Sequence, residues 1–292
     1  MKHVSIVLMI CFSALIYAGC NNEETNTGGQ ADTAGAASDI VSGWKLGPQM
    51  WAFRMFTFLE GLEKTDSVGL KSIEAFWGQP LGGGLKDSFG INMSADSRAK
   101  VKEWLQSKGI GITAMGVIVP KSREEWVSAF ELAKEFGLSY ITTEPRKNHW
   151  DMIDSLAGQY DIKLAIHDHP TPSAYWHPDS VLAAIQGRQH IGACADVGHW
   201  ARSGLDPVEC LKKLEGHVYG VHLKDITTFG DPDAEDTVVS KGVINFPAIF
   251  AELKRQNFKG QFSIEQESNW YNNVPDMIFT ARYFKEEVEK LK

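Results

Sequence analysis

The sequence predicts an α/β protein, a (β/α)8 TIM barrel that forms a single domain. From Trp44 onward, a short apolar segment, a polar or glycine-rich turn and an amphipathic segment follow one another repeatedly. Eight such units in about 250 residues give about 31 residues per unit, as a barrel of this type requires. An open doubly wound sheet is the alternative, but the end of the first apolar segment lacks the glycine-rich phosphate turn expected of it.

The candidate strands are short apolar runs bounded by turn residues. They are residues 46–53, 72–76, 111–117, 140–143, 163–167, 191–196, 218–223 and 261–265. Helices are predicted between them at residues 94–107, 122–136, 178–185, 207–214, 247–256 and 275–291. The segment Ser122-Arg-Glu-Glu has the pattern of a capping box. The last four helices begin with proline, whose missing N–H costs nothing in the first helical turn.

The N-terminus has the layout of a secretory signal. Lys2 and His3 precede an apolar run at residues 4–17, which is too short for a stable membrane span, and small residues then precede Cys20. The sequence Tyr-Ala-Gly-Cys resembles the processing box of bacterial lipoproteins, whose cysteine is acylated. This resemblance implies a signal peptide at 1–19 and a lipid anchor at Cys20. The expected location is extracytoplasmic, on the periplasmic side or the cell surface. Plain secretion is the first alternative and an uncleaved anchor the second.

Residues 20–43 are expected to form a flexible tether between the anchor and the barrel at 44–292. The segment is polar, rich in Gly, Ala and Thr, and free of aromatic residues, so it cannot bury enough apolar surface to offset the entropy of ordering. Cys194 lies in an apolar strand and is predicted to be a core residue. Whether Cys194 pairs with Cys210 is left open.

The charge pattern excludes one class of partner. The formal net charge is −8, and the Lys and Arg residues are scattered along the chain. Binding to nucleic acid requires a concentrated basic surface that neutralises phosphates, so no nucleic-acid partner is expected. The sequence leaves a monomer and a homodimer open.

Polar residues follow five successive strands on a largely apolar background. They are Glu144, His167, His169, Asp196, His199, His222, Lys224 and Glu265. The C-terminal ends of strands converge at one mouth of a barrel, where active sites of this fold lie. Carboxylates gathered there would repel one another and raise one another's pKa, and a divalent cation removes that cost.

The expected metal ligands are Glu144, Asp196, His222 and Glu265. Three carboxylates and one imidazole form an oxygen-rich set that suits Mn²⁺, Mg²⁺ or Co²⁺, with Mn²⁺ preferred. Zn²⁺ is less favoured because this set contains few nitrogen or sulfur ligands.

These residues resemble those of the xylose-isomerase-like TIM-barrel superfamily, which includes sugar epimerases and inosose dehydratases. The resemblance covers residues 44–292. It implies that Glu144 and Glu265 also act as catalytic acid and base on opposite faces of the substrate, and that His199 contacts substrate. One departure is Lys224 followed by Asp225 after the strand-seven histidine, where the epimerases have arginine, and this puts epimerisation in doubt.

The expected activity is that of a sugar isomerase or epimerase. A metal ion that binds substrate oxygens stabilises an enediolate, and a carboxylate removes the proton α to the carbonyl. A non-phosphorylated sugar or keto-sugar is expected, since no phosphate cradle is visible. His167, Lys224 and Trp51 are further candidates for substrate contact. His169 is expected to contact the residues of the site rather than the substrate. Lys224 can also pair with Asp225 or Glu267.

Three alternatives remain open at the level of sequence. The same proton abstraction can lead to β-elimination, so a lyase that cleaves 3-keto-glycosides is the nearest rival. A sugar-binding lipoprotein without turnover is the second. A phosphodiester-cleaving enzyme with several zinc ions is the third, and it depends on the additional residues His167, His169 and His199.

Overall fold

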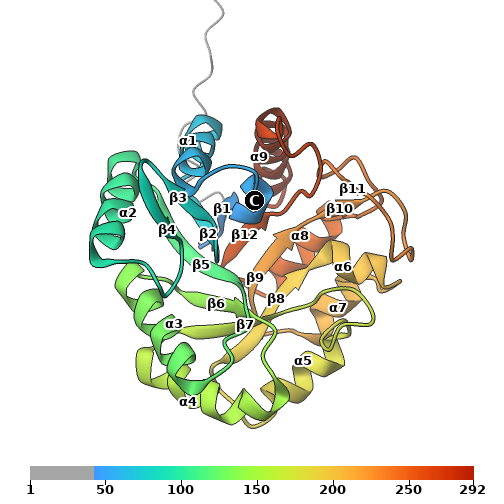
Figure 1. Ribbon diagram of the computed structural model, residues 1–292. Helices are drawn as coiled ribbons and strands as arrows, with labels where there is room; N and C mark the ends of the chain where they lie inside the picture. The colour runs from blue at the N-terminus through green and yellow to red at the C-terminus, as the bar shows by residue number, and fades with distance from the viewer. Residues whose placement is uncertain (1–42) are drawn as a thin grey trace, which may run out of the picture. The chain divides into compact units, whose positions relative to one another are not determined.

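The computed structural model describes residues 43–292, and these residues form a parallel eight-stranded barrel surrounded by helices (Figure 1). The predicted fold class is therefore confirmed. The barrel strands are β1 (Lys45–Pro48), β2 (Ser72–Phe76), β5 (Gly111–Ile118), β6 (Tyr140–Thr143), β7 (Lys163–His167), β8 (Ile191–Asp196), β9 (Val218–Leu223) and β12 (Gln261–Ile264). They pair in the order β1-β12-β9-β8-β7-β6-β5-β2, and a parallel bridge between Gln49 and Glu74 joins the two ends.

The first strand is the one that differs most from its prediction. Residues 46–53 were expected to form a single strand, but β1 ends at Pro48 and a 3₁₀ helix, η1 (Met50–Phe53), follows. The Gln49 side chain accepts a hydrogen bond from the Trp51 backbone N–H and caps this helix. Gln49, which was part of the predicted strand, therefore ends the strand by capping the helix that follows.

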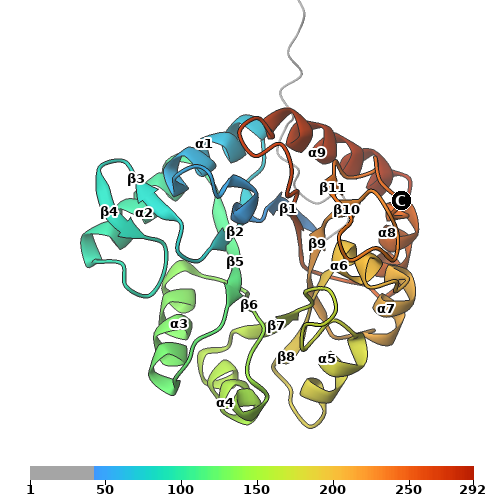
Figure 2. The same ribbon diagram turned by 45° about the vertical axis from the view of Figure 1, so that its right-hand side comes forward.

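The helices cover the outside of the barrel (Figures 1 and 2). They are α1 (Phe58–Val68), α2 (Ala95–Lys108), α3 (Arg123–Phe136), α4 (Trp150–Tyr160), α5 (Pro178–Ile185), α6 (Val197–Arg202), α7 (Pro207–Lys213), α8 (Phe246–Arg255) and α9 (Val274–Glu289), with a short 3₁₀ helix, η2 (Lys147–His149), before α4. The six predicted helices correspond to α2, α3, α5, α7, α8 and α9. The others were not predicted.

The capping box predicted at Ser122 is only half formed. The Ser122 side chain caps α3 by accepting from the Glu125 N–H, but Glu125 Oε2 accepts from the Lys121 backbone rather than completing the predicted capping box. A complete capping box is present instead at α1, between Thr57 and Glu60.

Two hairpins lie outside the barrel sheet. One is β3 (Pro80–Gly82) with β4 (Leu85–Ser88), which lies next to α2 (Figure 2). The other is β10 (Asp225–Ile226) with β11 (Asp236–Thr237), which follows β9 directly. The second hairpin extends the C-terminal end of β9 and so adds residues to the mouth where the candidate site lies.

The predicted signal peptide, the Cys20 anchor and nearly all of the tether lie outside the described residues. Within residues 43–292, no helix is long and apolar enough to span a membrane. In the same part of the chain, Cys194 and Cys210 are both buried and are free thiols. The disulfide that the sequence left open is therefore not formed in the structure.

Candidate metal centre

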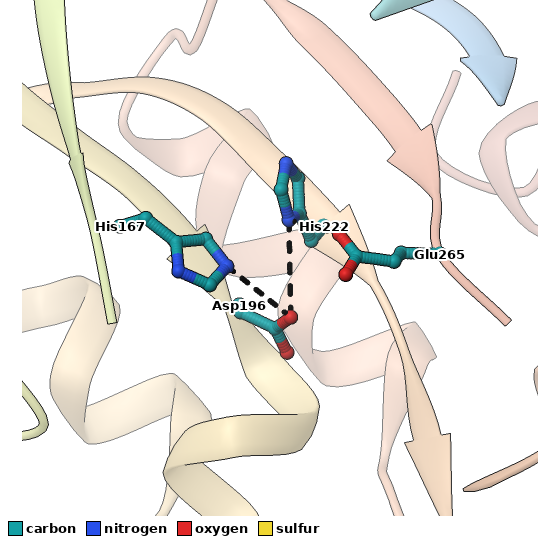
Figure 3. A group of neighbouring side chains, drawn as sticks. All are labelled: His167, Asp196, His222 and Glu265. Atoms are coloured by element: carbon teal, nitrogen blue, oxygen red, sulfur yellow. Dashed lines mark ion pairs between the residues drawn. The ribbon is translucent and has the colours of Figure 1, made fainter. Parts of the chain in front are cut away.

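Four buried side chains from four neighbouring strands meet at the C-terminal mouth of the barrel. They are His167, Asp196, His222 and Glu265, and each offers one ligand atom within 4.8 Å of the others (Figure 3). Asp196 Oδ2 lies 3.6 Å from His167 Nε2 and 3.8 Å from His222 Nδ1, and His222 Nδ1 lies 2.6 Å from Glu265 Oε2. Atoms that share one ion at about 2.0–2.2 Å lie about 3–4 Å apart. The two distances to Asp196 lie in this range, whereas the 2.6 Å between His222 and Glu265 is shorter and corresponds to a direct ion pair.

Each of these four residues has one buried side-chain atom that lacks a hydrogen-bond partner among the described residues. Among the described residues, His167 Nε2, Asp196 Oδ2, His222 Nδ1 and Glu265 Oε2 are buried and have no hydrogen-bond partner. These are the atoms that face one another in the group. Buried polar atoms without partners are rare because each one costs free energy, so four that converge at one point indicate a position for a cation.

The other atoms of Asp196 and His222 are held by the fold. Asp196 is the last residue of β8 and caps α6, since its Oδ1 accepts from the backbone N–H groups of Gly198 and His199 at 3.0 Å each. His222 Nε2 lies 2.9 Å from Glu74 Oε2 inside the barrel. One side of each residue is therefore fixed, and the other side faces the group.

Glu144, an expected metal ligand and catalytic residue, lies outside this group. Its Oε1 lies 3.3 Å from His167 Nδ1, makes a short contact with His169 Nδ1 and accepts from the His169 backbone at 3.1 Å. Glu144 with His167 and His169 forms a second candidate metal group, which shares His167 with the first. Of the expected ligands, the structure thus brings Asp196, His222 and Glu265 together, and His167 takes the fourth position.

Lys224 lies beside the metal group and is fully buried. Its Nζ lies 3.3 Å from Glu265 Oε1, 3.7 Å from Asp196 Oδ2 and 3.8 Å from Asp236 Oδ2, and it makes a short contact with Glu267. Of the two pairings expected for Lys224, the structure therefore shows the one with Glu267. The Asp225 carboxylate instead accepts the backbone N–H groups of Ile226, Gly242 and Ile244.

The two remaining candidates for substrate contact are His199 and Trp51. His199 is nearly buried, with Nε2 3.5 Å from Asp196 Oδ2 and Nδ1 3.2 Å from Arg202 Nη1. Trp51 is half-buried at the rim, where its indole N–H donates to Glu267 Oε2 at 3.1 Å and the Arg54 guanidinium lies 4.5 Å from its ring centroid.

The local electrostatics favour ionised carboxylates and a charged lysine. Burial alone would raise the pKa of Glu265, but the charges of Lys224 and His222 lower it. Burial would also raise the pKa of Glu144, but the hydrogen bonds of this carboxylate with His167 and His169 lower it below its usual value. Burial would lower the pKa of Lys224, but the neighbouring carboxylates, Glu265 first among them, raise it. Burial lowers the pKa of His199 well below its usual value, which favours the neutral imidazole.

The donor atoms of the four-residue group are two imidazole nitrogens and two carboxylate oxygens. This set is richer in nitrogen than the expected one, because His167 stands where Glu144 was expected. Imidazole suits Zn²⁺ and Fe²⁺, and carboxylate suits Mn²⁺ and Mg²⁺, so the mixed set fits a first-row divalent ion.

Glu74 and Asp236 were not predicted as parts of the site. Glu74 lies in the middle of β2 and is fully buried, and Asp236 lies in the β10–β11 hairpin. The signal for Glu74 was an acidic residue within a short apolar strand. No comparable signal exists for Asp236, which lies among other acidic residues in a polar loop.

Comparison with known proteins gives a family and several relatives. The family model described as xylose isomerase-like TIM barrel matches residues 62–292. Inosose dehydratase of Clostridium botulinum (strain Alaska E43 / Type E3) is 28% identical over 156 residues, which are 48% of this chain and 52% of that enzyme. The chain thus spans about half the length of the curated relatives that it matches.

Two solved structures illustrate the similarity in fold. An uncharacterised protein from Parabacteroides distasonis ATCC 8503 has a TM-score of 0.69 and 35% identity, covering 84% of this chain and 99% of that chain. The IOLI protein, solved with a bound zinc atom, has a TM-score of 0.65 and 20% identity, covering 84% of this chain and 98% of that chain. The second similarity concerns the fold alone.

Proposed function

The chain belongs to the xylose isomerase-like TIM-barrel family, and from this premise we propose that it is a metal-dependent enzyme that acts on a sugar or a related polyhydroxylated ring. Its first step is removal of the proton next to a carbonyl group. The observation that carries the proposal is the convergence of four buried, unpartnered ligand atoms, on His167, Asp196, His222 and Glu265, among the described residues at the barrel mouth. A divalent ion held by these residues would act as a Lewis acid towards the carbonyl and hydroxyl oxygens of the substrate.

The pair formed by Glu144 and His169 supports the assignment of the proton acceptor. Glu144 contacts His169 Nδ1, which orients the ring, and about half of the His169 side chain is exposed at the mouth. An imidazole that is oriented by a carboxylate is a common general base. Glu265 is the less suitable base because Lys224 and His222 stabilise its ionised form.

Of the possible outcomes, we favour β-elimination. Epimerisation needs a second acid–base group on the opposite face of the substrate, and the pair of metal-bound glutamates expected for that purpose is not supported by the position of Glu144. Curated relatives named inosose dehydratase add support. In the proposed reaction the base takes the proton next to the carbonyl, and the electrons of the C–H bond form an enolate. As the carbonyl re-forms, these electrons make a double bond to the next carbon while its C–O bond breaks, and the leaving oxygen keeps that electron pair and takes up a proton to depart as water or an alcohol.

The test is to incubate the metal-loaded protein in D₂O with 3-keto-glycosides, keto-cyclitols and free ketoses. We expect an unsaturated product, with release of water or of the aglycone, from substrates that carry a leaving group β to the carbonyl. Isomerised ketoses without any elimination would contradict β-elimination while keeping proton abstraction. Binding of these compounds with neither elimination nor deuterium incorporation would indicate a sugar-binding protein and overturn the enzyme proposal.

A pair of variants tests the assignment of the base. His169→Asn preserves an N–H group that can face Glu144 but removes the basic nitrogen, so both elimination and deuterium exchange should be lost. His217→Asn is the matched control, because His217 precedes β9 at the opposite end of the barrel. If H169N exchanges deuterium as fast as the wild type, another residue is the base.

We also propose that the protein is a lipoprotein anchored at Cys20 outside the cytoplasm. The proposal is supported by the basic start, the apolar run and the small residues that precede this cysteine. Metabolic labelling with a clickable fatty acid in a bacterial host should label the wild type in the membrane fraction and leave Cys20→Ser unlabelled. An unlabelled wild-type protein would contradict the anchor without affecting the proposed chemistry.

A further inference from the structure

Glu74 is a charged residue in the interior of the barrel, where branched apolar side chains are usual. It lies on β2 and is fully buried. Both of its carboxylate oxygens are occupied, since Oε1 accepts from Thr142 Oγ1 at 2.5 Å and Oε2 accepts from Ser263 Oγ at 2.7 Å. The third contact, at 2.9 Å, is between Oε2 and His222 Nε2. Three strands other than its own therefore hold this one carboxylate.

The contact with His222 determines which ring nitrogen is available on the other side. An ionised carboxylate can only accept, so His222 Nε2 must carry the hydrogen of this bond. When the ring binds a metal ion, Nδ1 would be the deprotonated nitrogen and would present its lone pair to the ion. Nδ1 is the atom that faces Asp196 and Glu265 in the metal group, and it has no hydrogen-bond partner among the described residues.

We propose that Glu74 is a positioning residue that fixes the Nε2–H tautomer and the ring orientation of His222, so that Nδ1 binds the metal ion. This inference rests on the metal site of the proposed function. Carboxylates that accept the second N–H of a metal-binding histidine stabilise one tautomer and increase the basicity of the ligand. Glu74 is 148 residues from His222 in the chain. It is not a member of the four-residue metal group, although with Cys194 and His222 it forms another group that could hold an ion.

The other two partners of Glu74 distinguish this role from simple packing. Thr142 and Ser263 satisfy the carboxylate, but they have no contact that would orient a ligand towards the group. If Glu74 only filled the interior, the loss of any of its three bonds would affect the protein in a similar way. If Glu74 positions His222, loss of its charge should weaken metal binding, whereas loss of the Thr142 bond should mainly affect stability.

The experiment compares Glu74→Gln with Thr142→Val in the full chain, titrated with Co²⁺ in competition with a chelator. Glutamine keeps the volume of Glu74, but its amide can donate to Nε2 and so favour the wrong tautomer. We expect E74Q to bind Co²⁺ about 10–100-fold more weakly and to show an altered d–d absorption spectrum. T142V should keep the wild-type spectrum and have a far smaller effect on affinity, even where its melting temperature falls.

Equal Co²⁺ affinity and identical spectra for E74Q and the wild type would overturn the role of Glu74 and leave the metal site intact. A wild-type protein that binds no Co²⁺ would instead remove the metal site of the proposed function, and the inference with it.

A measurement on the wild type covers the case in which E74Q does not fold. Long-range ¹H–¹⁵N spectra of the zinc-loaded protein should show His222 as the Nε2–H tautomer, with the resonance assigned by its loss in His222→Gln. An Nδ1–H tautomer would overturn the proposal.

Discussion

Two groups of charged side chains share the mouth of the barrel and differ in how their charges are balanced. In the metal group, two carboxylates and two imidazoles face one another with atoms that have no hydrogen-bond partner among the described residues. In what we call the lysine network (Lys224, Glu267, Asp236, Arg202 and Arg54), each carboxylate contacts two cations within the chain. The carboxylates of the network are therefore balanced by cations of the chain itself, whereas we propose that the metal group binds a cation from outside.

Lys224 connects the two groups, because it contacts Glu265 and Asp196 as well as Glu267 and Asp236. Its single charge is therefore shared among four carboxylates. This sharing leaves Asp196 and Glu265 with negative charge that a divalent ion can neutralise. The four predictions below separate the two groups, beginning with the largest expected effect.

Replacement of Lys224 by methionine should destabilise the protein by about 3–5 kcal/mol, since it leaves buried carboxylates without their cation. Denaturant unfolding measures the loss. The matched control is Lys213→Met, which removes an exposed lysine from its pair with Asp179 and should change stability by no more than about 0.5 kcal/mol. Similar small changes in both variants would show that the lysine network does not depend on Lys224.

Replacement of Asp196 by asparagine should weaken metal binding by at least about 100-fold, or about 2.7 kcal/mol. The reason is that Asp196 Oδ2 faces both histidines of the group. Isothermal titration with Mn²⁺, Co²⁺ and Zn²⁺ provides the measurement. Asp236→Asn is the control, and its affinity should stay close to that of the wild type. If both variants lose the metal equally, the two groups are a single unit.

Metal ions should stabilise the folded protein, because the group is assembled only in the native state. At a free metal concentration of 100 times Kd, the free energy of unfolding should rise by about 2.7 kcal/mol over the chelator-treated protein. Thermal unfolding with and without metal tests this. In His167→Ala the stabilisation at the same metal concentration should be smaller, whereas in Glu144→Gln it should be retained. If the stabilisation is instead retained in His167→Ala and reduced in Glu144→Gln, Glu144 is the fourth ligand.

Removal of Arg54 should have the smallest effect. Its pair with Glu267 has an N–O distance of 3.5 Å, and both side chains are more than a quarter exposed. Water screens such a pair, so Arg54→Ala should cost no more than about 1 kcal/mol. If Arg54→Ala lowers the free energy of unfolding about as much as Lys224→Met does in the same denaturant experiment, the lysine network depends on its exposed Arg54–Glu267 pair.

Much of the fold was accessible from the sequence because strand boundaries coincide with turn residues. The predicted strands at residues 72–76, 140–143, 163–167, 191–196 and 218–223 agree with β2, β6, β7, β8 and β9. The prediction was wrong for residues 49–53, where a side-chain cap stops the strand. The helix α4 and the two hairpins were missed because they lack strong start signals. The helix α1 was missed although Thr57 and Glu60 have the spacing of a capping box, and α6 was missed although Asp196 caps it.

The sequence by itself determined that Glu144, His167, Asp196, His222 and Glu265 would gather at one mouth, since the ends of parallel strands converge in a barrel. It could not decide which of them face one another. Barrel strands are tilted and staggered, so residues at equivalent strand ends lie at different heights. The tertiary structure decided that His167 joins Asp196, His222 and Glu265 and that Glu144 turns to His169. It also brought Glu74 to His222, a contact that depends on the closure of the barrel and has no signature in the local sequence.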